Sequence, residues 1–162
     1  MREAIIKAKE NLDSVGGEVE CAIVGINPGI GDPFFDSIES RISGMMFSIP
    51  AVKGIEFGMG FEFSKMYGSE ANDEFYIENN NVYTYTNNNG GINGGISNGM
   101  PIIFNVVIKP TPSIAKEQKT IDMEKNQNTT ISVQGRHDPC IVKRAVPVVE
   151  AAAALVVLDL IL

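Results

Sequence analysis

Hydrophobic positions along the chain switch between a helical and a strand period, so the sequence predicts a mixed fold. A helical period over residues 2–12 predicts a short amphipathic helix. Alternating or continuous apolar patterns over residues 18–26, 51–61 and 100–108 predict strands, and the last of these has the strongest pattern. The apolar segment from Arg144 to Leu162 predicts a buried helix.

A second helix is predicted between the first two strands. Asp32 can act as its N-cap, and Pro33 fits its first helical position. Apolar residues then recur at helical spacing, which is typical of a helix that faces a core. They are Phe34, Ile38, Ile42, Met45 and Met46. The first third of the chain is therefore predicted to form a strand–helix–strand unit.

The other segments are polar and rich in turn residues. Residues 68–74 predict a loop, and three consecutive asparagines allow either a hairpin or a mobile loop over residues 75–86. Residues 117–130 are polar and linker-like, and a short strand is expected at 131–133. Strands and helices joined by long connections favour an α+β fold over a doubly wound sheet, in a single domain over residues 1–162.

Composition and charge are those of an ordinary globular protein. The chain has 162 residues, is 44% hydrophobic and 20% charged, and has a formal net charge of −7. Such an acidic chain is poorly suited to non-specific nucleic-acid binding. An anionic ligand must then be held by a local group of cations. The candidates are Lys109, Lys116, Arg136, Lys143 and Arg144.

Cysteine usage and the apolar segments favour a cytoplasmic setting. Cys21 and Cys140 are far apart in sequence, and Cys21 is expected to be a buried free thiol because it lies in an apolar strand. Residues 1–11 are charged and lack the apolar centre of a signal peptide. The apolar stretch at 145–158 is interrupted by a proline and a glutamate and is shorter than the ~20 residues of a membrane span. No membrane partner is expected.

A glycine-rich segment at residues 90–99 is the first candidate for chemistry. Its five glycines let the backbone approach a flat ring or a phosphate closely. The segment is neither a dinucleotide fingerprint nor a P-loop, because the spacings of those motifs are absent. A flexible Asn/Gly loop is an equally open interpretation.

The segment Lys109-Pro110-Thr111-Pro112-Ser113 is a sharper candidate. Its prolines stiffen the turn, and its ammonium and hydroxyl groups can bind a phosphate. The alternative is an ordinary proline-rich turn.

The strongest candidate site is the turn Gly135-Arg136-His137-Asp138-Pro139-Cys140, which has three ionisable side chains in a row. Arg136 suits a planar or anionic partner, and Asp138 can act as a general base or polarise a ring N–H. Alternatively, Asp138 caps the following helix and pairs with Arg136. His137, the only histidine, is expected to be solvated or structural. No metal site is predicted, because no His/Cys cluster has ligand spacing.

Taken together, these motifs resemble the C-terminal part of chorismate synthase. The turn at 135–140, followed by Arg144-Ala145-Val146-Pro147 and Glu150-Ala151, is similar to that family's C-terminal signature. Residues 86–99 resemble its central glycine loop, and residues 109–114 its flavin-phosphate segment. Further matches follow the family order and lie at residues 13–17, 48–54 and 68–73.

The resemblance implies a β-α-β sandwich of antiparallel sheets and helices, and a lyase that uses reduced FMN. That family removes phosphate and a ring proton from 5-enolpyruvylshikimate 3-phosphate by anti-1,4 elimination. The product is chorismate, in the shikimate pathway of aromatic amino-acid biosynthesis. A cytoplasmic homotetramer and a link to NADP are also implied.

The resemblance also implies site residues. Asp138 and Arg136 are the expected catalytic residues, with Asp138 tuning the proton at flavin N5 and Arg136 beside flavin and substrate. The expected FMN contacts are Pro50, Ala51, Gly94, Lys109, Pro110, Thr111, Pro112, Ser113 and Arg136.

The chain departs from the family in several respects. It is much shorter, and it lacks the N-terminal half that carries the catalytic histidines and a substrate-binding arginine cluster. His137 falls on a variable position, and Lys143 stands where many members have a neutral residue. The apolar end at residues 160–162 indicates a piece of a longer protein or a chain that needs a partner. We expect no turnover by the isolated chain; the alternative is a non-enzymatic flavin- or anion-binding module that needs a partner chain.

Overall fold

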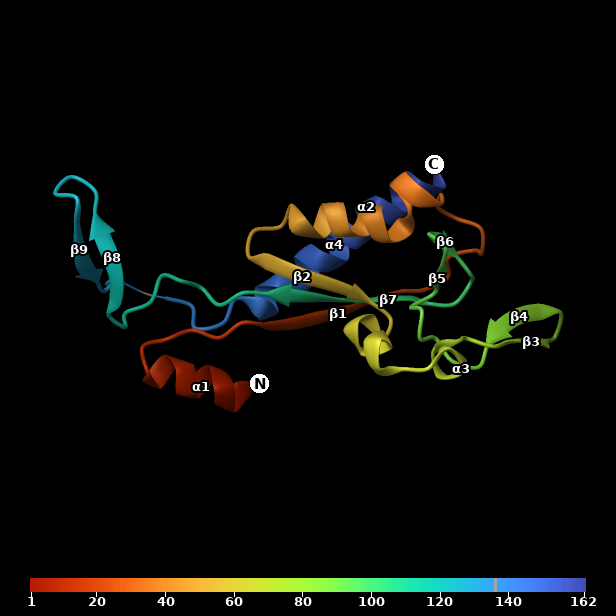
Figure 1. Ribbon diagram of the computed structural model, residues 1–162, viewed down its shortest axis with the longest axis horizontal. Coiled ribbons are helices and arrows are strands. Elements are labelled where there is room, and N and C mark those ends of the chain that lie inside the picture. The colour runs from red at the N-terminus through yellow and green to blue at the C-terminus, as the bar shows by residue number, and fades with distance from the viewer. Residues whose placement is uncertain (136) are drawn as a thin grey trace.

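An antiparallel sheet with two helices on one face forms the centre of the computed structural model (Figure 1). The central strand β7 (Ile102–Ile108) pairs on one side with β1 (Gly17–Ile23) and on the other with β2 (Val52–Phe57). Helices α2 (Ile38–Phe47) and α4 (Val142–Ile161) pack against each other and against this sheet. The α+β prediction and the strand–helix–strand unit β1-α2-β2 are confirmed.

The alternation along β7 determines which face of the sheet is buried. Every second residue of β7 is almost fully buried beneath the helices: Ile102, Phe104, Val106 and Ile108. Helix α2 buries Ile38, Ile42 and Met46, which are spaced four residues apart and therefore lie on one helical face. Helix α4 adds Val149 and Val156 to the same core. Burial of each such side chain stabilises the fold by roughly 1.5–3 kcal/mol.

Helix α2 begins later than the sequence predicts. Ser37 is its N-cap, because the Ser37 Oγ accepts the Ser40 N–H at 3.1 Å. Pro33 is extended, and a single turn of 3₁₀ helix, η1 (Phe34–Asp36), comes between it and the helix. The predicted start at Asp32 and Pro33 is therefore wrong. Phe34 is 86% exposed and contributes nothing to the core, which corrects its predicted role.

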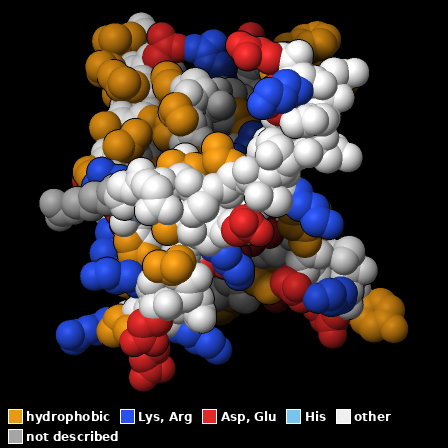
Figure 2. All heavy atoms as spheres, turned by 90° about the vertical axis from the view of Figure 1, so that its left-hand side faces the viewer, with side chains coloured by type: hydrophobic (Ala, Val, Ile, Leu, Met, Phe, Trp, Pro, Cys, Tyr) orange, Lys and Arg blue, Asp and Glu red, His pale blue; other side chains and the backbone are white. Residues whose placement is uncertain are grey.

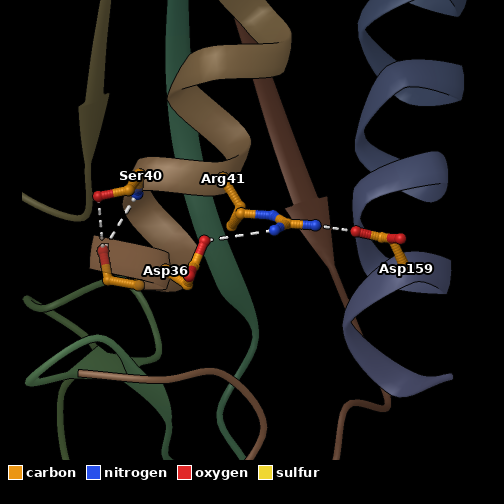
Figure 3. Close-up of polar contacts among 5 residues, drawn as sticks. Asp36, Ser40, Arg41 and Asp159 are labelled. Carbon is orange, nitrogen blue, oxygen red and sulfur yellow. Dashed lines mark hydrogen bonds and ion pairs between the residues drawn. The ribbon is translucent and has the colours of Figure 1, made fainter. Parts of the chain in front are cut away.

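A polar link joins the two covering helices. Arg41 of α2 donates hydrogen bonds to Asp36 and to Asp159, which lies near the C-terminal end of α4 (Figure 3). The three side chains are exposed to solvent, so the link adds little to stability beyond the apolar packing beneath it.

Two hairpins project from opposite ends of the structure (Figure 1). One pairs β3 (Phe75–Glu78) with β4 (Asn81–Thr84), which decides between hairpin and loop in favour of the hairpin. The other pairs β8 (Gln118–Asp122) with β9 (Gln127–Ile131). The linker predicted over residues 117–130 is therefore wrong, as is a separate strand at 131–133.

The structure describes residues 1–135 and 137–162. The remaining elements are short, and they change the predicted bounds by a few residues. They are α1 (Arg2–Glu10), the 3₁₀ helix η2 (Gly60–Lys65), α3 (Gly68–Ala71), β5 (Ile92–Asn93) and β6 (Ile96–Ser97). Strand β2 thus ends before η2, and the predicted loop at 68–74 contains a helical turn.

The cysteines and helix α4 differ in part from expectation. Cys21 is half-buried, whereas Cys140 is buried in the core, so the prediction of a buried Cys21 is wrong. Only one face of α4 is buried; Leu155, Leu158 and Ile161 are exposed on it. Within the described residues, no helix is long and apolar enough to cross a membrane.

Candidate functional site

Strand β7 separates the predicted site residues into two groups. The segment Lys109–Ser113 follows its C-terminal end, where Val52 of β2 pairs with Ile108. Gly94 lies between β5 and β6, in the loop that precedes the N-terminal end of β7. A strand of seven residues spans about 20 Å, so the two groups are far apart within one chain.

The predicted contacts at Ala51 and Lys109 are brought together by the backbone. The Lys109 N–H donates a hydrogen bond to the Ala51 carbonyl at 2.9 Å. Ala51 has a φ of +75°, a conformation that costs a non-glycine residue roughly 1–2 kcal/mol. The preceding Pro50 is exposed, as is the Lys109 side chain. This hydrogen bond thus joins the segment after α2 to the end of β7.

Thr111 is held through its backbone and leaves its hydroxyl unused. The Ser14 hydroxyl donates to the Thr111 carbonyl at 2.6 Å, and the Gln118 side chain donates to the Pro112 carbonyl at 3.1 Å. The Thr111 Oγ1 is buried and has no hydrogen-bond partner among the described residues. A buried hydroxyl without a partner costs roughly 1–3 kcal/mol. Such an atom is a natural contact for a bound polar group.

The carboxylate of Asp138 is held by one backbone group and one cation. Its Oδ1 accepts the Cys140 N–H at 3.1 Å, and its Oδ2 lies 3.1 Å from the Arg144 guanidinium. The Pro139 carbonyl accepts the Val15 N–H at 2.9 Å, which ties this turn to the start of β1. The capping alternative is wrong, because α4 begins after its N-cap Ile141 without a side-chain capping hydrogen bond; Asp138 instead closes the turn ahead of the helix and pairs with Arg144. Arg136 lies outside the described residues.

His137 has a local partner. Its Nε2 is 2.8 Å from the Val133 carbonyl, so the ring is fixed by the backbone of its own turn. This agrees with the prediction of a structural histidine. Across residues 1–135 and 137–162, no group of three or more His, Cys, Asp or Glu side chains is arranged to hold a metal ion.

A cavity of about 720 Å³ brings Thr111 and Asp138 together. A second cavity of about 270 Å³ lies beside it, and among the described residues the two share Lys9, His137, Asp138 and Pro139 as lining. Arg144 lines the larger cavity as well. Lys109 and Ser113 belong to the same segment as Thr111 but are not among the lining residues. Lys9 was missed by sequence reasoning, because an exposed lysine in a short helix carries no signal of its own.

The charges around these cavities are mixed in sign. Lys116 pairs with Asp13 at 3.1 Å, and the Ser14 N–H also donates to Asp13. Together the Ser14 N–H and the Lys116 ammonium hold the pKa of Asp13 below its usual value. Figure 2 looks at this end of the molecule and shows acidic and basic side chains close together rather than one broad basic patch.

The glycine segment forms a tight hairpin that packs against α2. Gly94 and Gly95 have φ values of +59° and +89°, as the two-residue turn between β5 and β6 requires. A Cβ on Gly95 would lie 2.7 Å from the Ser37 Cβ, whereas a Cβ on Gly94 would meet nothing within 4 Å. Turn geometry and packing therefore account for Gly95, and Gly94 faces open space.

Asp73 organises the chain that leads into this hairpin, and sequence reasoning missed it. Its carboxylate accepts hydrogen bonds from the Thr86 hydroxyl, the Asn88 N–H, the Asn89 N–H and the Asn89 side chain, at 2.7–2.9 Å. Burial raises the pKa of Asp73, but these hydrogen bonds outweigh it and lower the pKa below its usual value. The Met59 N–H then donates to the Asn88 carbonyl at 2.8 Å, which joins the segment to the end of β2.

The fold and the site define an α+β protein with a polar cavity that combines a hydroxyl, a carboxylate and cations, as a site for an anionic ligand does. The chorismate synthase family model matches residues 1–162, so the chain belongs to the chorismate synthase family.

Individual relatives agree with this assignment. The chorismate synthase of Methanothermobacter thermautotrophicus is 51% identical over 160 residues, which cover 98% of this chain and 43% of the relative. That of Dehalococcoides mccartyi is 49% identical over 162 residues, covering 100% of this chain and 44% of the relative. A crystal structure of chorismate synthase superposes with a TM-score of 0.78 at 32% identity, covering 98% of this chain and 40% of that one. The chain thus spans less than half the length of these relatives.

Proposed function

We propose that this chain supplies the flavin-binding part of a chorismate synthase. The reaction is the anti-1,4 elimination of phosphate from 5-enolpyruvylshikimate 3-phosphate, with reduced FMN as cofactor. The single observation that carries the proposal is the cavity in which Thr111, from the predicted flavin-phosphate segment, faces Asp138, the predicted catalytic residue. These residues are far apart in sequence, and the fold places them on one cavity.

The residues of this cavity fit an FMN molecule. The volume of about 720 Å³ lies in the range of cofactor pockets. The buried Thr111 Oγ1 lacks a partner, so it can donate to a phosphate oxygen without breaking an existing bond. Lys9 and Arg144 add positive charge on the same cavity wall. When bound, reduced FMN supplies electron density that assists departure of phosphate from the allylic carbon.

The chain's own residues bind the flavin, orient it and control one of its protons. In this proposal Lys109, Thr111 and Ser113 bind the flavin phosphate, Pro110 and Pro112 stiffen that segment, and the Pro50-Ala51 backbone borders the ring. Asp138 controls the proton at flavin N5 and is held for that task by the Cys140 N–H and by Arg144. Arg136 lies beside flavin and substrate. Gly94 stays a predicted contact; it precedes β7, a strand about 20 Å long, whereas the segment Lys109–Ser113 follows that strand.

The proposal is tested by flavin binding and by turnover, measured separately. FMN is titrated into the chain under anaerobic reducing conditions, and binding is followed by flavin absorbance. We expect FMN to bind, and Asp138→Asn to preserve binding. No FMN binding at millimolar concentrations overturns the proposal. In a steady-state chorismate assay we expect the isolated chain to be inactive, because the family's remaining length supplies the histidines and arginines that contact substrate.

A second candidate function is a non-enzymatic flavin- or anion-binding module that acts only with a partner chain. The apolar side chains of Leu155 and Leu158 that α4 exposes favour that dependence, because a partner chain can bury them. The two candidates separate when the chain is mixed with the missing part of a relative. Recovered turnover that Asp138→Asn abolishes supports the enzyme; binding without turnover supports the module.

Family membership motivates three further proposals. We propose that residues 1–162 form one domain, that the complete protein is a cytoplasmic homotetramer, and that NADP is linked to reduction of the flavin. Sedimentation equilibrium of the complete protein tests the tetramer.

A further inference from the structure

Among the described lysines and arginines, Lys9 is the one that lines both cavities. It lies in the last turn of α1 and lines the cavity with Thr111 as well as the smaller cavity beside it. The helix is held in this position by its C-terminal end, because the Lys116 N–H donates to the Leu12 carbonyl at 3.1 Å and Ala8 is buried. Lys9 is thus presented to the cavities by a docked helix.

Two other cations near the cavities, Arg144 and Lys116, are already paired. Arg144 lies 3.1 Å from a carboxylate oxygen of Asp138, and Lys116 lies 3.1 Å from one of Asp13. Among the residues that the structure describes, Lys9 has no carboxylate within 4.0 Å. Its full charge is therefore available to a ligand in either cavity.

A second, independent observation points to the same ligand chemistry. The Thr111 Oγ1 on the wall of the larger cavity is buried and lacks a partner within the described part of the chain. A phosphate monoester accepts both a hydroxyl hydrogen bond and the charge-assisted hydrogen bonds of an ammonium. An ammonium and an unused hydroxyl on one cavity wall are matched to that group.

We propose that Lys9 binds the phosphate of the flavin together with Thr111. The inference rests on the proposed function and adds a residue from α1 to the site. The substrate also carries a phosphate monoester. The flavin is favoured because Thr111 belongs to the segment 109–113, which resembles the flavin-phosphate segment of the family.

The test compares two lysines of the same helical turn. Lys9→Gln removes the charge on the cavity, and Lys7→Gln removes an exposed charge that lines neither cavity. Affinities are measured for FMN and for riboflavin, which lacks the phosphate. We expect Lys9→Gln to weaken FMN binding about tenfold or more and to leave riboflavin unchanged. Equal loss for both ligands, or equal loss in Lys7→Gln, overturns the proposal.

A chemical-protection experiment separates failure of this inference from failure of the proposed function. The chain is acetylated with a water-soluble reagent, and modification of Lys9 and Lys7 is compared by mass spectrometry. We expect FMN or inorganic phosphate to protect Lys9 more than Lys7. Protection by phosphate without any FMN binding overturns the proposed function but keeps the anion site. Protection of Lys9 by the substrate alone overturns the flavin assignment, and equal protection of both lysines overturns the site.

Discussion

The two ends of β7 both carry turn-rich motifs, one rich in Asn and Gly and the other in Pro, and their polar groups are used differently. At the N-terminal end, beside the glycine segment (the glycine end), the carboxylate of Asp73 accepts four hydrogen bonds, and the Ser97 hydroxyl accepts from Ile30 and donates to Asn27. One buried atom there, the Asn87 Oδ1, lacks a partner among the described residues. At the cavity end, the Thr111 hydroxyl has no partner and Lys9 has no carboxylate within 4.0 Å among the described residues. Satisfied groups stabilise the chain itself, whereas unsatisfied ones are available to a ligand. Substitutions of Asp73 and of Thr111 should therefore have opposite effects on stability.

The largest effect is expected for Asp73→Asn. The substitution removes the charge and one acceptor from a buried group with four donors, so we expect the free energy of unfolding to fall by about 3 kcal/mol. Urea denaturation followed by circular dichroism measures the change. Glu74→Gln, at the exposed neighbouring position, is the control and should change stability by less than about 0.5 kcal/mol. Similar values for the two variants would show that the network does not stabilise this end.

A matched pair of glycine substitutions tests the packing of the same end. Gly95→Ala meets both a positive φ and a contact of 2.7 Å with the Ser37 Cβ, so we expect a loss of about 2–3 kcal/mol. Gly94→Ala meets only the positive φ and should lose about 1 kcal/mol. Thermal unfolding of the two variants ranks them. The reverse order would contradict the packing of this hairpin on α2.

Acid should weaken the glycine end through the same carboxylate. Because the folded-state pKa of Asp73 lies below the unfolded value of about 3.9, its contribution is complete above that value and is lost as the pH falls through the folded pKa. The wild-type chain should therefore lose more stability than Asp73→Asn as the pH falls below about 4. Urea midpoints of both proteins across this range provide the measurement; parallel curves would exclude Asp73 as the cause.

The smallest expected effect has the opposite sign. Thr111→Val replaces an unpartnered buried hydroxyl with a methyl group of similar shape, so we expect the ligand-free chain to gain about 1 kcal/mol. The same variant should bind FMN more weakly. Thr129→Val, at an exposed position of β9, is the control and should leave both stability and FMN binding nearly unchanged. A loss of stability in Thr111→Val would contradict the assignment of an unused hydroxyl.

The central part of the fold was predictable because its apolar residues recur at strand or helical spacing. The pattern of β7 and the apolar residues of α2 and α4 predict their elements directly. The β8–β9 hairpin was not predictable from that pattern, since β9 is exposed throughout. Its turn depends on local bonds: the Asp122 carboxylate accepts two backbone N–H groups at 3.1 Å, and Asn126 has a φ of +48°.

The start of α2 and the set of residues around the cavity show a different limit of prediction from sequence. Asp32-Pro33 and Ser37 are both reasonable helix starts, and only packing decides that the helix begins after Ser37. Thr111 and Asp138 were named from their residue types and the family resemblance. Lys9 was not, because its position depends on how α1 docks, and no local pattern records a tertiary contact. The separation of Gly94 from Lys109, in contrast, follows from the length of β7, which the apolar pattern at 100–108 does predict.

The position of β7 between two partner strands also affects how fast different segments open to solvent. Its amides are hydrogen-bonded to β1 or to β2, so we expect them to exchange with solvent hydrogen more slowly than those of the flanking hairpins. A segment at either end can then open and close while β7 stays intact. Hydrogen exchange should therefore resolve two fast-opening units on either side of one slow one, and a ligand that orders the cavity end should slow exchange there and leave the glycine end unchanged.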